Sequence, residues 1–190
     1  MDSNNQLQNI VLHFRRIMES HQKHLEHFCD HGVQLEGWLK GEFLCFLEDY
    51  KSTGRMVNFD REVRFGGSKR KIDFCLEIPG AILSSYVWIE LKHWLIGFQK
   101  GYKLNPIFYF TDPSSVGIKP DVDKLMSIKE GDRYLLILCN ANPGTEEWLR
   151  GVTKFNDKFT NSRIESLTNP AEFPRSYFLG LLRVLGYASG

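Results

Sequence analysis

The chain lacks paired cysteines and an N-terminal export signal. Its four cysteines, at positions 29, 45, 75 and 139, form no CxxC motif and no other paired spacing. This excludes a disulfide framework or a zinc knuckle and favours reduced thiols. The opening MDSNNQLQ is polar, without the basic and apolar regions of a secretory signal. We therefore expect a cytoplasmic or otherwise intracellular protein.

Long hydrophobic runs are also missing. The longest, Leu135 to Cys139, is far shorter than the ~20 residues of a membrane-spanning helix. The sequence contains no internal repeat and no low-complexity segment. We expect no membrane association.

Neither sign of charge is in excess over the whole chain. The 190 residues include 24 Lys and Arg and 23 Asp and Glu, a net charge of +1, which argues against a protein that coats nucleic acid. Residues 51–103, however, hold ten Lys and Arg against five acids, so this segment is +5 and the remainder is −4. A local phosphate-facing surface is therefore compatible with the near-zero total.

Hydrophobic periodicity predicts one α/β domain. The hydrophobic content of 42% excludes a disordered chain, and the length suits a single core. Helical spacing covers about 5–30 and 35–50, and strand patterns follow. The expected elements after the second helix are strands Val57–Phe65, Lys71–Glu77 and Tyr86–Lys92, helix Asp121–Lys129, strand Arg133–Cys139 and a helix near Ser176–Leu185. We expect a mixed central sheet in the order αβββαβ, a core of about 35–140, and a helical extension over about 145–190.

Three charged residues on two of these strands share a face. Alternation in Tyr86–Lys92 separates Glu90 and Lys92 from the apolar Val87, Ile89 and Leu91. If the second and third strands form a hairpin in which Asp73 opposes Glu90, the apolar residues also pair. The pairs are Ile72–Leu91, Phe74–Ile89 and Leu76–Val87. The hydrophobic pattern therefore independently brings Asp73, Glu90 and Lys92 to one side of the sheet.

Opposed carboxylates indicate a cation site. Asp73 and Glu90 repel each other unless a cation lies between them, and an all-oxygen site suits Mg²⁺ or Mn²⁺. Glu42 adds a third acid, because it falls on the apolar stripe of the second helix between Trp38 and Phe46 and needs a partner there. The alternative is a set of structural ion pairs, since Glu-x-Lys is common on solvated strands.

This combination resembles the PD-(D/E)XK nuclease superfamily. The resemblance rests on Asp73, on Ile89-Glu90-Leu91-Lys92, on a preceding helix with Lys40-Gly41-Glu42, and on the element order. It covers about residues 35–140, with Ile72 where the superfamily often has proline. It implies a restriction-endonuclease-like fold and a Mg²⁺-dependent endonuclease that hydrolyses phosphodiester bonds, with Mn²⁺ as a substitute. It also implies DNA rather than RNA as substrate.

The resemblance also implies roles for individual residues. Asp73, Glu90 and the Leu91 carbonyl would bind metal, Glu42 would hold a metal-bound water or a second ion, and Lys92 would act on the attacking water. A homodimer or a larger nuclease complex would provide two cuts. The rival hypotheses are a catalytically silent nucleic-acid-binding or assembly module, an RNA-directed nuclease, and a domain whose acids form structural ion pairs.

Further residues are candidates for nucleic-acid contacts. The turn that ends in Lys69-Arg70-Lys71 is a plausible phosphate clamp, although charge runs are usually solvated. His93 follows the motif strand and could contact a phosphate or serve the structure. Gln99, with Tyr102, resembles a pair found in exonuclease-type members of the superfamily, and Lys100 and Lys103 lie beside them. For the histidines of the first helix, a solvated face is favoured over a zinc site.

Overall fold

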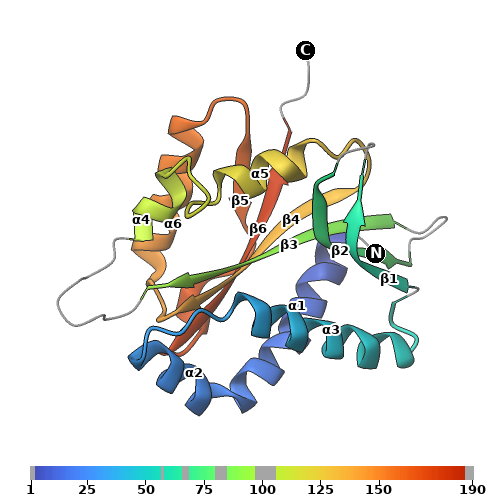
Figure 1. The fold of residues 1–190 in the computed structure, drawn as a ribbon, viewed down its shortest axis with the longest axis horizontal. Coiled ribbons are helices and arrows are strands. Elements are labelled where there is room, and N and C mark those ends of the chain that lie inside the picture. The colour runs from blue at the N-terminus through green and yellow to red at the C-terminus, as the bar shows by residue number, and fades with distance from the viewer. Residues whose placement is uncertain (1–2, 57, 66–68, 80–84, 97–105, 187–190) are drawn as a thin grey trace.

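Six strands form one sheet between two layers of helices (Figure 1). This computed structural model describes residues 3–56, 58–65, 69–79, 85–96 and 106–186. The strands are β1 (Asn58–Arg64), β2 (Lys71–Ile78), β3 (Ser85–Leu95), β4 (Asp132–Asn140), β5 (Arg163–Ser166) and β6 (Tyr177–Leu185). The helices are α1 (Ser3–Ser20), α2 (Gln22–Asp30), α3 (Glu36–Ser52), α4 (Pro106–Thr111), α5 (Lys119–Met126), α6 (Thr145–Lys158) and the short 3₁₀ turn η1 (Pro170–Glu172). None of these helices is long and apolar enough to cross a membrane.

The sheet is mixed, as the sequence predicts. Its strand order is β1-β2-β3-β4-β6-β5, with β3 and β4 parallel and every other neighbouring pair antiparallel. A parallel pair needs a crossover connection, and α4 and α5 lie in the chain between β3 and β4. The prediction of an α/β fold with a mixed sheet is confirmed.

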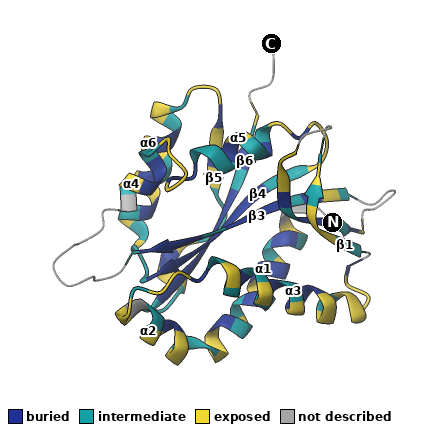
Figure 2. Ribbon diagram, in the orientation of Figure 1, coloured by how far each residue is buried: buried dark blue, intermediate teal, exposed yellow. Residues whose placement is uncertain are grey.

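Each face of the sheet has its own hydrophobic core. On one face, α1, α2 and α3 pack Phe14, Leu25 and Phe43 against strand residues such as Leu76 and Leu136. On the other face, α4, α5 and α6 contribute a second set of apolar side chains, among them Phe110, Leu125 and Trp148. The buried positions accordingly run along the middle of the sheet and the inner sides of the helices (Figure 2). A strand between two such layers is apolar on both sides.

The predicted C-terminal helix is wrong, because Tyr177–Leu185 is strand β6. Tyr177, Leu179 and Leu181 enter the core on one face, and Phe178 and Leu182 enter the core on the other. A short apolar run buried on both sides cannot be distinguished from a buried helix by periodicity. In the described part of the expected helical extension, residues 145–186, α6 is the one α-helix, and the strands β5 and β6 follow it.

The other elements lie close to their predicted places. The helix expected over about 5–30 is divided at His21 into α1 and α2. The hairpin register is confirmed for Phe74↔Ile89 and Leu76↔Val87. Ile72 departs from the prediction, because it is buried in the core on the α5 side rather than with Phe74 and Leu76. The β2–β3 pairing ends at Phe74↔Ile89, which releases Ile72 from that face.

Two helical glycines give a matched test of this packing. An added Cβ at Gly151 would come within 2.2 Å of the Phe110 ring, whereas one at Gly41 would meet nothing within 4 Å. We expect Gly151→Ala to cost about 1–3 kcal/mol through overpacking. Gly41→Ala should gain up to about 1 kcal/mol from helix propensity. Urea unfolding of both variants checks this, and equal midpoint shifts would contradict the packing described for α4 and α6.

Candidate active site

Asp73 and Glu90 face each other where β2 and β3 separate. The regular pairing of these strands ends at Phe74↔Ile89. Beyond it, the Leu91 N–H donates to Asp73 Oδ2 at 2.9 Å, and the Asp73 N–H donates to Glu90 Oε2 at 3.4 Å. Side-chain carboxylates therefore accept the N–H bonds that backbone carbonyls would accept in a continuing ladder. The predicted proximity of the two acids is present in the structure. Their predicted common side is wrong, because Asp73 contacts Lys40 on α3, whereas Glu90 contacts Lys124 on α5, on the opposite face of the sheet.

The strand on the other side of Asp73 is also irregular at this level. Arg61↔Phe74 and Val63↔Ile72 are paired, and Glu62 between them has a left-handed φ of 51°. Its carboxylate is 2.6 Å from Lys71 Nζ, and this bond lowers the pKa of Glu62. Regular strand pairing is therefore interrupted on both sides of Asp73, towards β1 and towards β3.

Two lysines that the sequence analysis did not assign contact the carboxylates. Lys40 Nζ on α3 lies 2.9 Å from Asp73 Oδ1 and 3.0 Å from Glu36 Oε1, and Lys124 on α5 forms an ion pair with Glu90. The two helices cover opposite faces of the sheet (Figure 1), so each layer supplies one ammonium group. The only sequence signal for Lys40 was its i,i+4 spacing from Glu36.

Lys92 lies beside Glu90 on β3, and it too is held by a residue of α5. Its Nζ is 2.8 Å from Asp121 Oδ2 and donates to the Ser115 carbonyl at 3.1 Å. Asp121 and Lys124 are one turn apart on α5, and their partners Lys92 and Glu90 are two residues apart on β3. One turn of α5 thus gives each of these two β3 residues a partner of opposite charge.

The charged form of Glu90 is disfavoured in the absence of metal. Glu90 is 5% exposed, and burial together with the charge of Asp73 raises its pKa to about 8, although the Lys124 contact acts in the opposite direction. Burial alone would lower the pKa of Lys40, but its bonds to Asp73 and Glu36 raise it above the ordinary value. A cation of higher charge between the two carboxylates would therefore stabilise their ionised forms.

The donor set suits a hard divalent ion. In the described part of the chain, no group of three or more His, Cys, Asp or Glu side chains converges as a metal cage. Mg²⁺ does not require one, because it is usually bound through one or two carboxylates and keeps several waters. Asp73 and Glu90, each now facing a lysine ammonium, fit this requirement.

The structure does not bring Glu42 into this cluster, contrary to expectation. Glu42 lies two residues beyond Lys40, about 200° around α3. Its Oε2 is 3.5 Å from Nε2 of His21 at the α1–α2 break. A histidine of the N-terminal layer is therefore the partner that this half-buried acid needs. Glu36, which bonds Lys40, is the acid of α3 that belongs to the site.

His93 supports the structure instead of presenting a ring nitrogen to a phosphate. It is 6% exposed, its Nδ1 accepts from the Leu35 N–H at 3.1 Å, and its Nε2 lies 2.8 Å from Asn140 Oδ1. Burial lowers the pKa of His93, although the bond to Asn140 opposes this. The neutral ring therefore joins the start of α3 to the end of β4.

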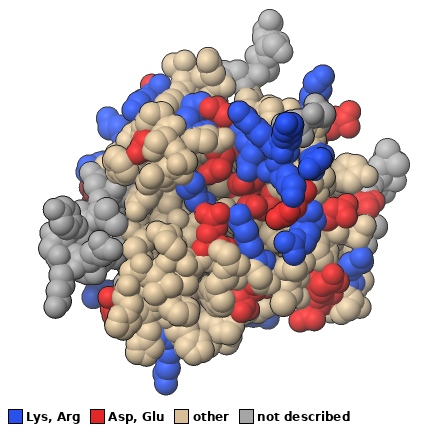
Figure 3. Space-filling model, in the orientation of Figure 1, with Lys and Arg blue, Asp and Glu red and all other residues tan. Residues whose placement is uncertain are grey.

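The predicted phosphate clamp lies on the surface near the site. Lys69, Arg70 and Lys71 are exposed at the start of β2, and Lys71 contacts Glu62. Lys and Arg side chains gather over α5 and the β1–β2 pair, beside a group of acids (Figure 3). The other predicted contacts, Gln99, Lys100 and Lys103, lie outside the described residues.

Comparisons of the chain with protein-family models, curated proteins and solved structures find no match.

The raised pKa of Glu90 predicts a pH-dependent stability in the absence of metal. Between the ordinary value of 4.5 and about 8, the folded protein keeps a proton that the unfolded chain releases. The free energy of unfolding therefore falls as pH rises through this window. Glu90→Gln, which stays neutral, should melt higher than wild type at pH 8 in EDTA, by roughly 2–4 °C for each kcal/mol relieved. Glu48→Gln, on the exposed side of α3, is the control. Parallel pH profiles of wild type and Glu90→Gln would show that Glu90 is ionised across this range.

Proposed function

We propose that the protein is a Mg²⁺-dependent nuclease that hydrolyses phosphodiester bonds of DNA, with Mn²⁺ able to substitute. The observation that carries this proposal is the close pair formed by the half-buried Asp73 and the buried Glu90 at the separation of β2 and β3. Lys92 follows Glu90 by two residues on β3. The order of α3, three strands, the α4–α5 crossover and β4 supports the resemblance to PD-(D/E)XK nucleases. Exposed basic residues beside the site suit a polyanionic substrate.

The chain's residues would divide the work of hydrolysis. Asp73, Glu90 and the Leu91 carbonyl would hold the divalent ion, which supplies Lewis acidity and an activated water to phosphodiester cleavage. The Lys92 ammonium would bind a non-bridging phosphate oxygen, where negative charge develops. Asp121 holds that ammonium on the α5 side of the sheet, as Lys124 holds Glu90. Lys40 pairs with Asp73 and Lys124 pairs with Glu90 when no ion is bound.

One observation favours a second candidate, a catalytically silent nucleic-acid-binding module. Each carboxylate already faces an ammonium group, and Lys92 faces Asp121. In such a module these ion pairs would be permanent, and the basic surface alone would bind nucleic acid. Buried ion pairs are weak evidence for stability, so the pairing does not decide between the two candidates.

Cleavage assays with single-residue variants test the nuclease. Plasmid and single-stranded substrates are incubated with Mg²⁺, Mn²⁺ or EDTA. Asp73→Asn and Lys92→Ala should each lower the metal-dependent rate by about 10²–10³-fold, the usual cost of losing one transition-state contact. Lys154→Ala, which removes a similar charge from the exposed side of α6, should cleave like wild type. Undiminished cleavage by either site variant would exclude this site.

Metal binding gives a readout that does not depend on activity. Mn²⁺ at a hundred times its dissociation constant should stabilise wild type by about 2.7 kcal/mol and raise its melting temperature, but leave Asp73→Asn nearly unchanged. Salt-sensitive DNA binding without cleavage and without a Mn²⁺ shift would favour the silent module. Absence of both responses would leave structural ion pairs as the explanation of the cluster.

A further inference from the structure

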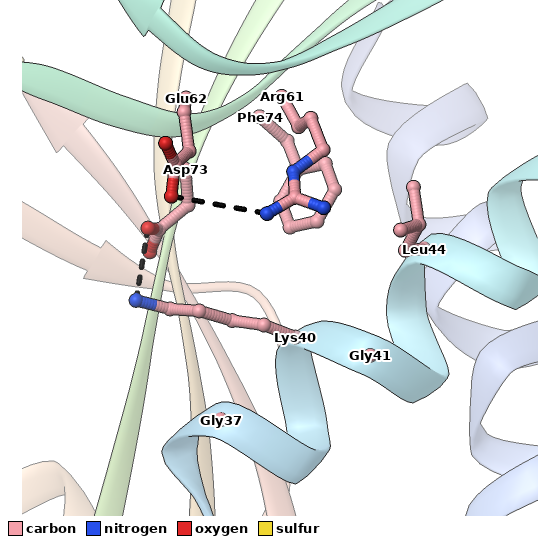
Figure 4. Close-up of a pocket in the computed structure, with 8 residues that line it drawn as sticks. All are labelled: Gly37, Lys40, Gly41, Leu44, Arg61, Glu62, Asp73 and Phe74. Atoms are coloured by element: carbon pink, nitrogen blue, oxygen red, sulfur yellow. Dashed lines mark ion pairs between the residues drawn. The ribbon is translucent and has the colours of Figure 1, made fainter.

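An open pocket of 320 Å³ lies between α3 and β1 and ends at Asp73 (Figure 4). Gly37, Lys40 and Gly41 of α3 form one wall, and Arg61 and Glu62 of β1 form another. The pocket therefore shares Asp73 with the candidate metal site but extends from it on the α3 side. Its volume is near the lower end of the roughly 300–1,000 Å³ of small-ligand sites, enough for one nucleotide unit.

Packing within the chain does not explain the two glycines of this wall. A helical glycine costs roughly 0.5–1 kcal/mol relative to alanine. At Gly151 on α6 the cost has a packing reason, because a Cβ would come within 2.2 Å of the Phe110 ring. At Gly37 and Gly41 a Cβ would meet nothing within 4 Å. The absent side chains leave the pocket open, and its occupant lies outside the chain.

Two cations and two acids line the pocket, with Lys40 and Arg61 facing its space beside Asp73 and Glu62. The Lys40 ammonium and the Arg61 guanidinium project into the space from α3 and β1 (Figure 4). The Arg61 side chain is 60% exposed, and its guanidinium contacts Glu62 Oε1 loosely, at 3.8 Å. Glu62 is held more tightly by Lys71, whose Nζ lies 2.6 Å from Oε2. Leu44, half-buried on α3 beyond Gly41, adds an apolar surface. Lys40 is already paired with Asp73 and Glu36, so Arg61 is the cation that a ligand would use. A phosphate beside Arg61, with its sugar or base against Leu44, would contact both.

We propose that this pocket is a subsite for one nucleotide of the DNA strand that is cut, adjacent to the phosphate at Asp73 and Glu90. The inference rests on the proposed nuclease function and adds the path of the strand, which leaves the metal site between α3 and β1. Gly37 and Gly41 admit the nucleotide, and Arg61 binds its phosphate.

Filling the pocket tests the subsite. The probe is a fluorescein-labelled single-stranded DNA of mixed sequence, measured by anisotropy with Ca²⁺ in place of Mg²⁺. Gly41→Leu should weaken binding at least about tenfold. Arg61→Gln should weaken it and lower the slope of log affinity against log salt by about one. Cys45→Leu adds the same side chain one turn along on the exposed surface of α3 and should bind like wild type.

The outcomes separate the subsite from the nuclease. Gly41→Leu should keep the Mn²⁺ shift in melting temperature, which shows that it is folded and that Asp73 and Glu90 are intact. Gly37→Leu provides a second filled pocket should Gly41→Leu fail to fold. Weakened binding by the filled variants in a protein that never cleaves DNA would support the subsite while rejecting the nuclease. Equal binding by wild type and the filled variants, or no DNA binding by wild type, would overturn the subsite.

Discussion

Two carboxylates inside a β-sheet need hydrogen-bond donors and positive charge, and most of this structure supplies them. The regular pairing of β2 and β3 ends at Phe74 and Ile89, and next to this pair backbone N–H groups donate to the side chains of Asp73 and Glu90. Each helical layer then adds one lysine. Burial, and then the charge of Asp73, still hold the pKa of Glu90 near 8, so its charged form is disfavoured there. A bound cation would favour the charged form, which is the physical reason to regard the cluster as a binding site.

The fold could be predicted from sequence wherever burial differed between the two sides of an element. Alternation in β2 and β3 gave the correct hairpin register at Phe74 and Leu76, because one side of each strand is more polar there. It failed at β6, whose residues are buried on both sides, so the strand has no polar face to reveal its period. The predicted pairing of Ile72 was wrong for a different reason, because the regular β2–β3 pairing runs only between the hairpin turn and Phe74 and does not include Ile72.

The site was predictable only in its strand residues. The period of two brings Asp73 close to Glu90 and Lys92 without knowledge of the helices. It does not predict that Asp73 turns to the α3 side while Glu90 and Lys92 turn to the α5 side. Glu42 was assigned from its apolar stripe, but the stripe does not show which neighbouring layer provides the partner, and that partner is His21. Lys124 and Asp121 reach the site through the crossover between two parallel strands, and local sequence carries no record of such a long-range approach. The neighbouring pocket likewise depends on how α3 packs over β1.

The eight-residue helix α5 supplies the partners of both Glu90 and Lys92. A helix this short has little stability of its own, so its position depends on the burial of Val122 and Leu125 and on the contacts of Asp121 and Lys124. Local opening of α5 would therefore strip Glu90 and Lys92 of their partners in a single event. The amide hydrogen exchange of this helical turn would then report how often Glu90 and Lys92 lose their partners, without any probe attached to either residue.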